Sequence, residues 1–154
     1  MKVVIGSDHA GYHLKSLILP SLEEAGHEVI DCGVASEQEV TDYPDIAEKI
    51  ARQILLKDNE PILGMALCGT GIGIAIAANK IPGIRAAVCH DVYTAGLSRE
   101  HNDANILALG ARVIGSGLAL AIVEVFLNTD FAGGRHQIRL DKIKQIEKTY
   151  SERG

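Results

Sequence analysis

Short runs of apolar residues alternate along the chain with longer segments in which apolar residues recur every three or four positions. The short runs have the length and composition of buried strands, and the longer segments have the spacing of amphipathic helices. The predicted strands are residues 3–5, 28–30, 62–67, 85–88 and 106–109. The predicted helices cover residues 14–26, 44–54, 72–79, 92–101, 117–127 and 137–150.

Strands that alternate with crossover helices predict a parallel sheet covered by helices on both faces. We therefore predict one domain over residues 1–154, an α/β fold that forms a three-layer αβα sandwich. Its core is a five-stranded, parallel, doubly wound (Rossmann-like) sheet, and a C-terminal helix follows the last strand. The first helix should face the core with a stripe made of Leu14, Leu17, Ile18 and Leu22.

Composition and charge narrow the classes of function. The 154 residues are 47% hydrophobic, enough for one core, and their net charge of −5 disfavours a nucleic-acid or anionic-membrane surface. The apolar run at residues 3–5 is too short for a signal-peptide core or a membrane span, so we expect a cytoplasmic protein. Three widely spaced cysteines without a C-x-x-C pair indicate reduced thiols rather than disulfides or a zinc knuckle.

Two unusual segments follow predicted strands 1 and 3. The first is Gly6-Ser7-Asp8-His9-Ala10-Gly11, and the second is Cys68-Gly69-Thr70-Gly71-Ile72-Gly73. In a sheet of order 2-1-3-4-5 the winding reverses between strands 1 and 3, and ligands bind at the carboxyl ends of the strands there. The two segments should therefore face each other across one crevice.

The glycine-rich segment should bind an anion, because backbone amides without side chains in the way approach a ligand at the start of a helix. A dinucleotide fingerprint is excluded by Ile74 and Ile76, each of which stands where that motif needs its last glycine. A Walker loop and the C-x-x-x-x-x-R loop of cysteine phosphatases are also absent, since Ile74 occupies the arginine position of the latter. An anion site beside a thiol remains.

Cys68 is the candidate general base, because helix dipole and backbone amides favour a thiolate at a helix start. The alternative is a small buried hydrophobic residue, which is how we interpret Cys32 and Cys89. The position of Cys68 at a strand end before a glycine turn favours function.

Histidines and arginines supply further candidates. His9 and His13 have the spacing of a helical zinc pair, but Ala10 replaces the glutamate of that motif, so metal binding is disfavoured. His101 ends a predicted helix, where a catalytic imidazole and a cation that compensates the helix dipole are both consistent with the sequence. Arg135 and Arg139 share a helix face after two glycines, which fits either a solvated surface or a fork for a phosphate dianion.

Together these motifs closely resemble those of the type B ribose-5-phosphate isomerases, a family that includes allose-6-phosphate and galactose-6-phosphate isomerases. The resemblance extends over nearly the whole chain. It covers both glycine segments and also Thr41-Asp42-Tyr43-Pro44, Ser98-Arg99-Glu100-His101-Asn102-Asp103 and Gly133-Gly134-Arg135-His136.

The resemblance implies a metal-independent aldose-ketose isomerase of the pentose phosphate pathway that uses no cofactor. It implies a homodimer, or a dimer of dimers, with each active site at a subunit boundary. The partner small molecule would be a phosphorylated aldose or ketose, with neither nucleic acid nor membrane as a partner. Cys68 resembles the base that moves a proton between C2 and C1, and His101 the group that opens the furanose ring.

The resemblance also implies roles for the surrounding residues. Thr70 and Asp8 belong with the catalytic group, and Asp8 and Tyr43 hold sugar hydroxyls. The enediolate is stabilised by Asn102 and by the amides of the turn, among them Gly69, Gly71 and Gly73. The implied phosphate clamp is His9, Arg112, Arg135 and Arg139.

In one branch of the resembled family a carboxylate replaces the cysteine base. This sequence resembles the cysteine branch, because no acidic residue occurs between Cys68 and Asn79. The intact Cys-Gly-Thr-Gly pattern points to an enzyme of the ribose type that needs only one kind of chain. An isomerase of a six-carbon aldose 6-phosphate is the alternative, and a non-catalytic sugar-phosphate-binding module is a further one.

Overall fold

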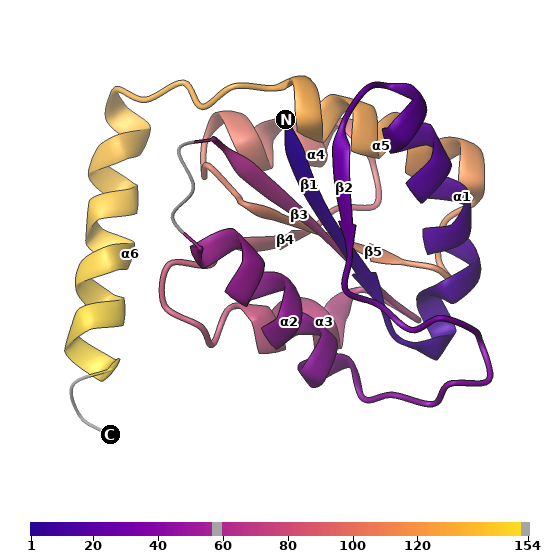
Figure 1. The fold of residues 1–154 in the computed structure, drawn as a ribbon. Coiled ribbons are helices and arrows are strands. Elements are labelled where there is room, and N and C mark those ends of the chain that lie inside the picture. The colour runs from indigo at the N-terminus through magenta and orange to yellow at the C-terminus, as the bar shows by residue number, and fades with distance from the viewer. Residues whose placement is uncertain (57–59, 152–154) are drawn as a thin grey trace.

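The computed structural model describes residues 1–56 and 60–151 and contains one five-stranded sheet in which every neighbouring pair of strands is parallel (Figure 1). The strands are β1 (Lys2–Ser7), β2 (Glu28–Asp31), β3 (Ile62–Cys68), β4 (Ala86–Val88) and β5 (Ile106–Gly110). The helices are a short 3₁₀ helix η1 (His9–Gly11), α1 (Tyr12–Glu24), α2 (Tyr43–Leu55), α3 (Ile72–Ala78), α4 (Val92–Glu100), α5 (Ser116–Asn128) and α6 (Arg135–Ser151). The predicted fold class is confirmed.

The order of the strands is β2-β1-β3-β5-β4, so the expected order 2-1-3-4-5 was wrong in its last two positions. Burial explains the difference. All five residues of β5 are buried, whereas β4 has only three residues and none of them is buried. The more apolar strand therefore takes the inner position and the short strand forms the edge. The reversal of winding between β1 and β3 is unaffected.

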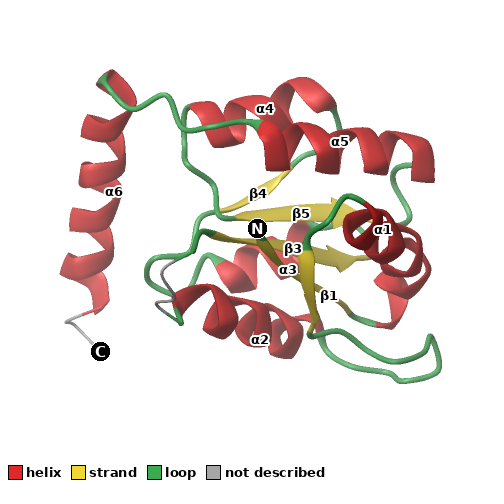
Figure 2. Ribbon diagram, turned by 45° about the horizontal axis from the view of Figure 1, so that its top comes forward, coloured by secondary structure: helices red, strands yellow, loops and turns green. Residues whose placement is uncertain are grey.

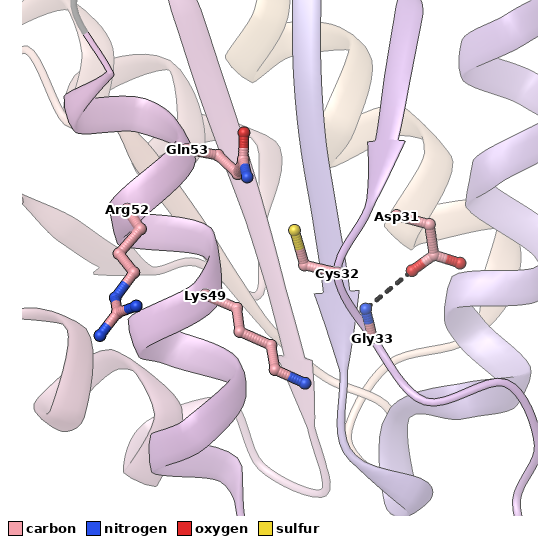
Figure 3. A pocket seen from close by; sticks show the side chains of 6 residues that line it. All are labelled: Asp31, Cys32, Gly33, Lys49, Arg52 and Gln53. Atoms are coloured by element: carbon pink, nitrogen blue, oxygen red, sulfur yellow. Dashed lines mark hydrogen bonds between the residues drawn. The ribbon is translucent and has the colours of Figure 1, made fainter.

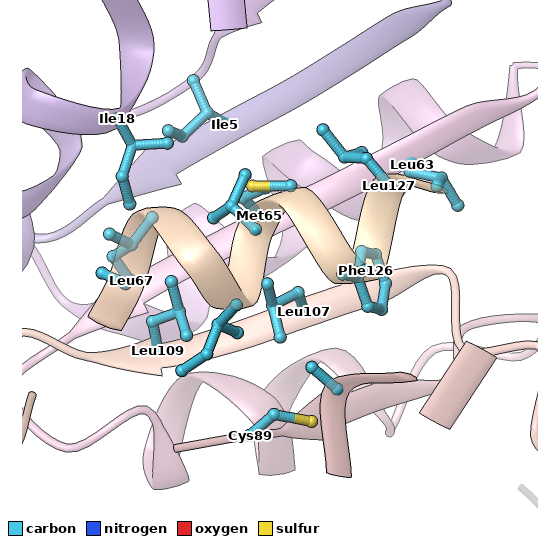
Figure 4. Close-up of a cluster of buried hydrophobic side chains, with 14 of the residues drawn as sticks. Ile5, Ile18, Leu63, Met65, Leu67, Cys89, Leu107, Leu109, Phe126 and Leu127 are labelled. Atoms are coloured by element: carbon cyan, nitrogen blue, oxygen red, sulfur yellow. The ribbon is translucent and has the colours of Figure 1, made fainter. Parts of the chain in front are cut away.

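Helices cover both faces of the sheet (Figure 2). On one face α1, α4 and α5 bury a cluster that includes Ile5, Leu107 and Phe126 (Figure 4). On the other face α2 and α3 bury a second cluster around Ile50 and Ile74. This three-layer arrangement fixes the strand ends, and the loops at those ends carry the candidate chemistry.

The inward face of α1 differs from the predicted stripe at one position. Leu14, Ile18 and Leu22 are buried as expected, but Leu17 is 54% exposed. Lys15, which the apolar pattern assigned no role, is only 3% exposed. A charged residue is therefore enclosed where α1 passes over the end of β2.

α6 lies beside the rest of the molecule rather than within its layers (Figures 1 and 2). Leu140 is its single buried residue among those described, and a carboxylate of Glu147 accepts hydrogen bonds from the Gly83 N–H at 3.2 Å. Ile138 and Ile146 remain about 60% exposed, at 61% and 59%. None of the helices in the described part of the chain is both long and apolar enough to cross a membrane.

Candidate active site

Cys68 is the last residue of β3 and is 4% exposed. The N–H of Gly71 donates a hydrogen bond to its Sγ at 3.2 Å, and the N–H of Ile72 donates to the Thr70 hydroxyl at 3.3 Å. A backbone N–H directed at sulfur stabilises negative charge there. The turn therefore directs one backbone N–H at the thiol and another at the neighbouring hydroxyl.

Gly71 gives the turn its shape. Its φ of +77° lies in the left-handed region, and a Cβ on it would lie 2.9 Å from the carbonyl carbon of Leu109. The residues after β5 hold the same turn, since the N–H groups of Ala111 and Arg112 donate to the carbonyls of Cys68 and Gly69 at 2.9 and 3.0 Å. Glycine is required here both for its backbone conformation and for close packing.

The turn after β1 adjoins the turn after β3, as the sequence predicts. Ser7 is in register with Leu67, and the Asp8 N–H donates to the Leu67 carbonyl at 3.3 Å. The Asp8 side chain is buried and accepts a hydrogen bond from the Gly11 N–H at 3.0 Å. One of its carboxylate oxygens thus caps η1, which fixes the direction of the carboxyl group.

Three more predicted residues line the same edge of the sheet. The ring of Tyr43 lies against Gly73, so a Cβ on that glycine would be 2.7 Å from the ring carbon Cζ. His9 Nδ1 lies 3.4 Å from the Thr41 N–H that donates to it. A guanidinium nitrogen of Arg112 lies 3.2 Å from the position of a Cβ on Gly69.

The structure therefore brings most of the predicted site together at the carboxyl ends of β1, β3 and β5. We call this set the carboxyl-edge group. Its members are Asp8, His9, Tyr43, Cys68, Gly69, Thr70, Gly71, Gly73 and Arg112.

His101, Asn102, Arg135 and Arg139 lie at the opposite, amino-terminal edge. α4 runs back from the end of β4 towards the start of β5, and His101 is the residue that caps its C-terminus. The imidazoles of His101 and His136 stack with ring centroids 4.2 Å apart, which brings the start of α6 to the same edge. We call His101, Asn102, Arg135, His136 and Arg139 the amino-edge group.

The strand length separates the two groups. Asn105, just after the amino-edge loop, accepts a hydrogen bond from the Gly64 N–H near the start of β3, whereas Cys68 ends that strand. Four residue steps of about 3.3 Å place these points roughly 13 Å apart along the strand. In Figure 2 the arrows of β3 and β5 point away from α6. One chain therefore does not bring His101 to Cys68.

Sequence reasoning missed the contacts that hold the amino-edge loop. Asp103 has a positive φ of 44°, and its carboxylate pairs with Arg85 and with Arg99, each at 2.9 Å. The Arg85 Nε also donates to the Asn102 carbonyl at 3.0 Å. An Asn-Asp pair directly after a helix was a usable signal, since these residues tolerate the left-handed conformation.

The surroundings of His136 at the amino edge lower the pKa of its imidazole. Loss of hydration lowers the pKa of its imidazole, and the neighbouring His101, Arg135 and Arg139 lower that pKa further, while Glu100 opposes them. The Arg139 guanidinium donates to the Arg135 carbonyl at 2.8 Å, so it is turned back towards the start of α6. This surface has a positive character that suits an anion.

The thiols of Cys32 and Cys89 belong to neither group, and one hollow, lined in part by Asn102 and Ile146, adjoins the amino-edge group. A hollow of about 380 Å³ at the end of β2 is lined by Asp31, Cys32, Gly33, Lys49, Arg52 and Gln53 (Figure 3). Burial raises the pKa of the Cys32 thiol, and burial likewise raises that of Cys89 in the core. Within residues 1–56 and 60–151 no three His, Cys, Asp or Glu side chains are grouped to hold a metal ion.

Comparison with known proteins gives a consistent result. The sequence model of the Ribose/Galactose Isomerase family matches residues 3–143. Ribose-5-phosphate isomerase B of Escherichia coli is 48% identical over 147 residues, which are 96% of this chain and 97% of that protein.

Solved structures agree in fold and in sequence. Ribose-5-phosphate isomerase B of Clostridium thermocellum superposes with a TM-score of 0.92 at 56% identity, covering 97% of this chain and 99% of that one. The corresponding isomerase of Thermotoga maritima gives a TM-score of 0.89 at 50% identity, covering 94% and 97%.

The lowered pKa of His136 predicts a pH dependence of stability. As the pH falls through the ordinary histidine value of 6.5, the unfolded chain takes up a proton before the folded chain does. Stability should therefore be full above this value and decrease as the pH falls below it. NMR titration of the imidazole protons should give His136 a midpoint below 6.5. The His136→Gln variant should lose less stability on acidification than the parent, because it lacks this imidazole. A His136 midpoint above 6.5 would contradict this.

Proposed function

Because the chain belongs to the ribose/galactose isomerase family, we propose that it interconverts ribose 5-phosphate and ribulose 5-phosphate. The observation that carries the proposal is the Cys68 thiol, 3.2 Å from the Gly71 N–H at a strand end beside Asp8 and Tyr43. A base next to several oxyanion donors is what an enediolate mechanism requires.

The thiolate of Cys68 removes the proton from C2 of the open-chain aldose and returns it to C1. The electron pair of the C2–H bond forms the C1–C2 double bond of the enediolate, and the C1 carbonyl oxygen becomes the oxyanion. The proton of the C2 hydroxyl passes to the oxyanion on O1, the C2 carbonyl forms, and the electron pair of the C1–C2 double bond takes the proton back from Cys68 at C1, so no external oxidant or reductant takes part. The amides of residues 69–73, the Thr70 hydroxyl and Asn102 stabilise the oxyanion, and one such donor is typically worth about 10²- to 10³-fold in rate.

Ring opening and phosphate binding use the remaining residues. His101 moves the proton between the ring oxygen and the anomeric hydroxyl, while Asp8 and Tyr43 orient the sugar hydroxyls. His9, Arg112, Arg135 and Arg139 hold the phosphate, whose binding energy positions carbons that are remote from it. Guanidinium groups suit a phosphate dianion because they bind it through two parallel hydrogen bonds.

The complete site needs a second copy of the chain. The carboxyl-edge and amino-edge groups lie at opposite ends of the strands, so we infer that His101, Asn102, Arg135 and Arg139 act on a substrate bound beside Cys68 of the partner. A C2 homodimer forms two such sites by one symmetric contact, and pairing of dimers leaves them unchanged. The exposed Ile138 and Ile146 on α6 provide apolar area for the contact.

The reaction needs reduced cysteine, which is consistent with a cytoplasmic enzyme. Cys32, Cys68 and Cys89 are all free thiols, and a reducing compartment keeps such thiols available. Oxidation of Cys68 to a disulfide or a sulfenic acid would leave no thiolate to take the proton.

Incubation with ribose 5-phosphate and detection of the ketose tests the proposal directly. Comparison of kcat/KM for ribose 5-phosphate with that for a six-carbon aldose 6-phosphate decides the chain length of the substrate. Binding of both sugars without turnover would instead indicate a sugar-phosphate-binding module.

Cys68→Ala should abolish isomerisation and leave folding and phosphate binding intact, because it removes the base but none of the anion-binding groups. Loss of a general base typically costs about 10²- to 10⁴-fold in kcat. Cys32→Ala is the matched control, since that thiol is outside both groups, and it should keep the parent rate. Near-normal activity of Cys68→Ala would contradict the assigned role.

His101→Asn should slow the two directions unequally. Ribose 5-phosphate is mostly a closed furanose, whereas the phosphate on C5 prevents ribulose 5-phosphate from forming that ring. The aldose-to-ketose rate should therefore fall by about 10²- to 10⁴-fold, and the initial rate from the ketose much less. Unequal losses do not change the overall equilibrium between aldose and ketose, because the variant can release the open-chain aldehyde, which then closes its ring in solution without the enzyme. Equal losses in both directions would count against ring opening by His101.

Mixing the two variants tests the shared site. When Cys68→Ala and His101→Asn chains are combined under conditions of subunit exchange, each mixed dimer holds one site with both residues intact. With random exchange about half of the dimers are mixed, so about a quarter of the parental rate from ribose 5-phosphate should return. A mixture no more active than its separate components would show that the site does not combine the two chains.

A further inference from the structure

The enclosed ammonium group of Lys15 has no part in the chemistry above. Only 4% of its side chain is exposed, which is unusual for lysine. Its Nζ donates to both carboxylate oxygens of Asp31, at 2.9 and 2.7 Å, and to the Val34 carbonyl at 2.7 Å. All three of its protons therefore have acceptors, and the buried charge is paired.

The partners of Lys15 begin the long segment between β2 and α2. Beyond the end of β2 this segment stays against β1, since the Cys32 and Val34 N–H groups donate to the carbonyls of Ile5 and Ser7 at 2.8 and 3.1 Å. A Cβ on Gly33 would lie 2.5 Å from the Ser7 nitrogen and 3.0 Å from Lys15 Nζ. The ammonium group thus fills the space between α1 and a segment that passes directly over the residue before Asp8.

The same segment leads to the candidate site. After residue 34 its residues are largely exposed, and it ends at Tyr43, whose ring lies on Gly73 of the anion-binding turn. Two further contacts tie it to the first helical region, His13 to Glu37 at 2.5 Å and His9 to the Thr41 N–H at 3.4 Å. The side chains of His13 and Glu37 are exposed, at 77% and 46%, so that pair is weak in water.

We propose that Lys15 is a positioning residue that holds the segment of residues 32–42, and through it Tyr43, at the sugar-binding end of the site. The proposal rests on the proposed function. Among the side-chain ion pairs and hydrogen bonds described for this segment, that of Lys15 is the one made by an enclosed charged group, and a partly buried ion pair loses less of its strength in salt than an exposed one. Loss of this contact releases the segment and displaces the Tyr43 ring from its place beside the turn, whereas Cys68 keeps its own hydrogen bond from Gly71.

The effect should therefore appear in substrate binding rather than in proton transfer. Lys15→Met keeps a side chain of similar length without charge, and Asp31 can be hydrated because 37% of its side chain is exposed. We expect KM for ribose 5-phosphate to rise about tenfold or more, with kcat changed less, since displaced positioning groups weaken the bound geometry. Lys80→Met, at an exposed lysine after α3, is the control and should leave both constants unchanged.

A double-mutant cycle with Tyr43→Phe shows whether Lys15 acts through Tyr43. If it does, Lys15→Met should raise KM by a much smaller factor in the Tyr43→Phe background than in the parent. Equal factors in both backgrounds, or a fall in kcat with KM unchanged, would overturn the proposal. Should Lys15→Met fail to fold, Asp31→Asn, which keeps the lysine but removes its counter-charge, replaces it in the cycle.

Amide hydrogen exchange gives a readout that does not depend on the reaction. Exchange in residues 35–42 should accelerate at least tenfold in Lys15→Met while residues of β1 and β3 keep the parental rates. Uniform acceleration across the sheet would indicate a general loss of stability and overturn the positioning role. If the parent isomerises no sugar phosphate, the proposed function fails, and the exchange experiment still decides whether Lys15 holds the segment.

Discussion

The burial of β3 on both faces is the constraint on which the rest of the molecule depends. Six of its seven residues are buried, and it pairs with β1 on one side and β5 on the other. Backbone hydrogen bonds and side-chain packing together fix its register, because a shift by one residue would exchange the two faces. Cys68 is therefore held between the ends of the neighbouring strands, at Ser7 and Gly110, and the turn that follows it inherits this position.

Much of the fold follows from the sequence for the same reason. A run such as Ile62–Cys68 contains no polar side chain, which is typical of an inner strand of a parallel sheet. The order of β4 and β5 does not follow, because both orders permit right-handed crossovers and the choice depends on how much apolar surface each strand buries. The burial of Lys15 could not be predicted from the sequence either, since the acceptors of its ammonium group, Asp31 and Val34, come from a distant segment.

One part of the candidate site could be predicted from the sequence and another part could not. The residues that follow β1 and β3 could be placed together from the sequence, because parallel strands end at one edge of a sheet. The stacking of His101 on His136 could not, since it depends on the path of the segment between α5 and α6. Local motifs therefore indicated which residues are candidates for the chemistry, and the topology shows that these candidates lie at the two ends of the strands.

In the proposed homodimer, where each site combines the two ends from different chains, this separation has a consequence for evolution. After a gene duplication, one copy of such a protein can lose the thiol end and the other the histidine end, and an assembly of the two still retains one whole site. Each copy then escapes selection on half of its former machinery, and its free end can acquire contacts for a different sugar or for a regulator. A chain whose reactive groups all met within one subunit would have no such route, because the first loss would inactivate that copy outright.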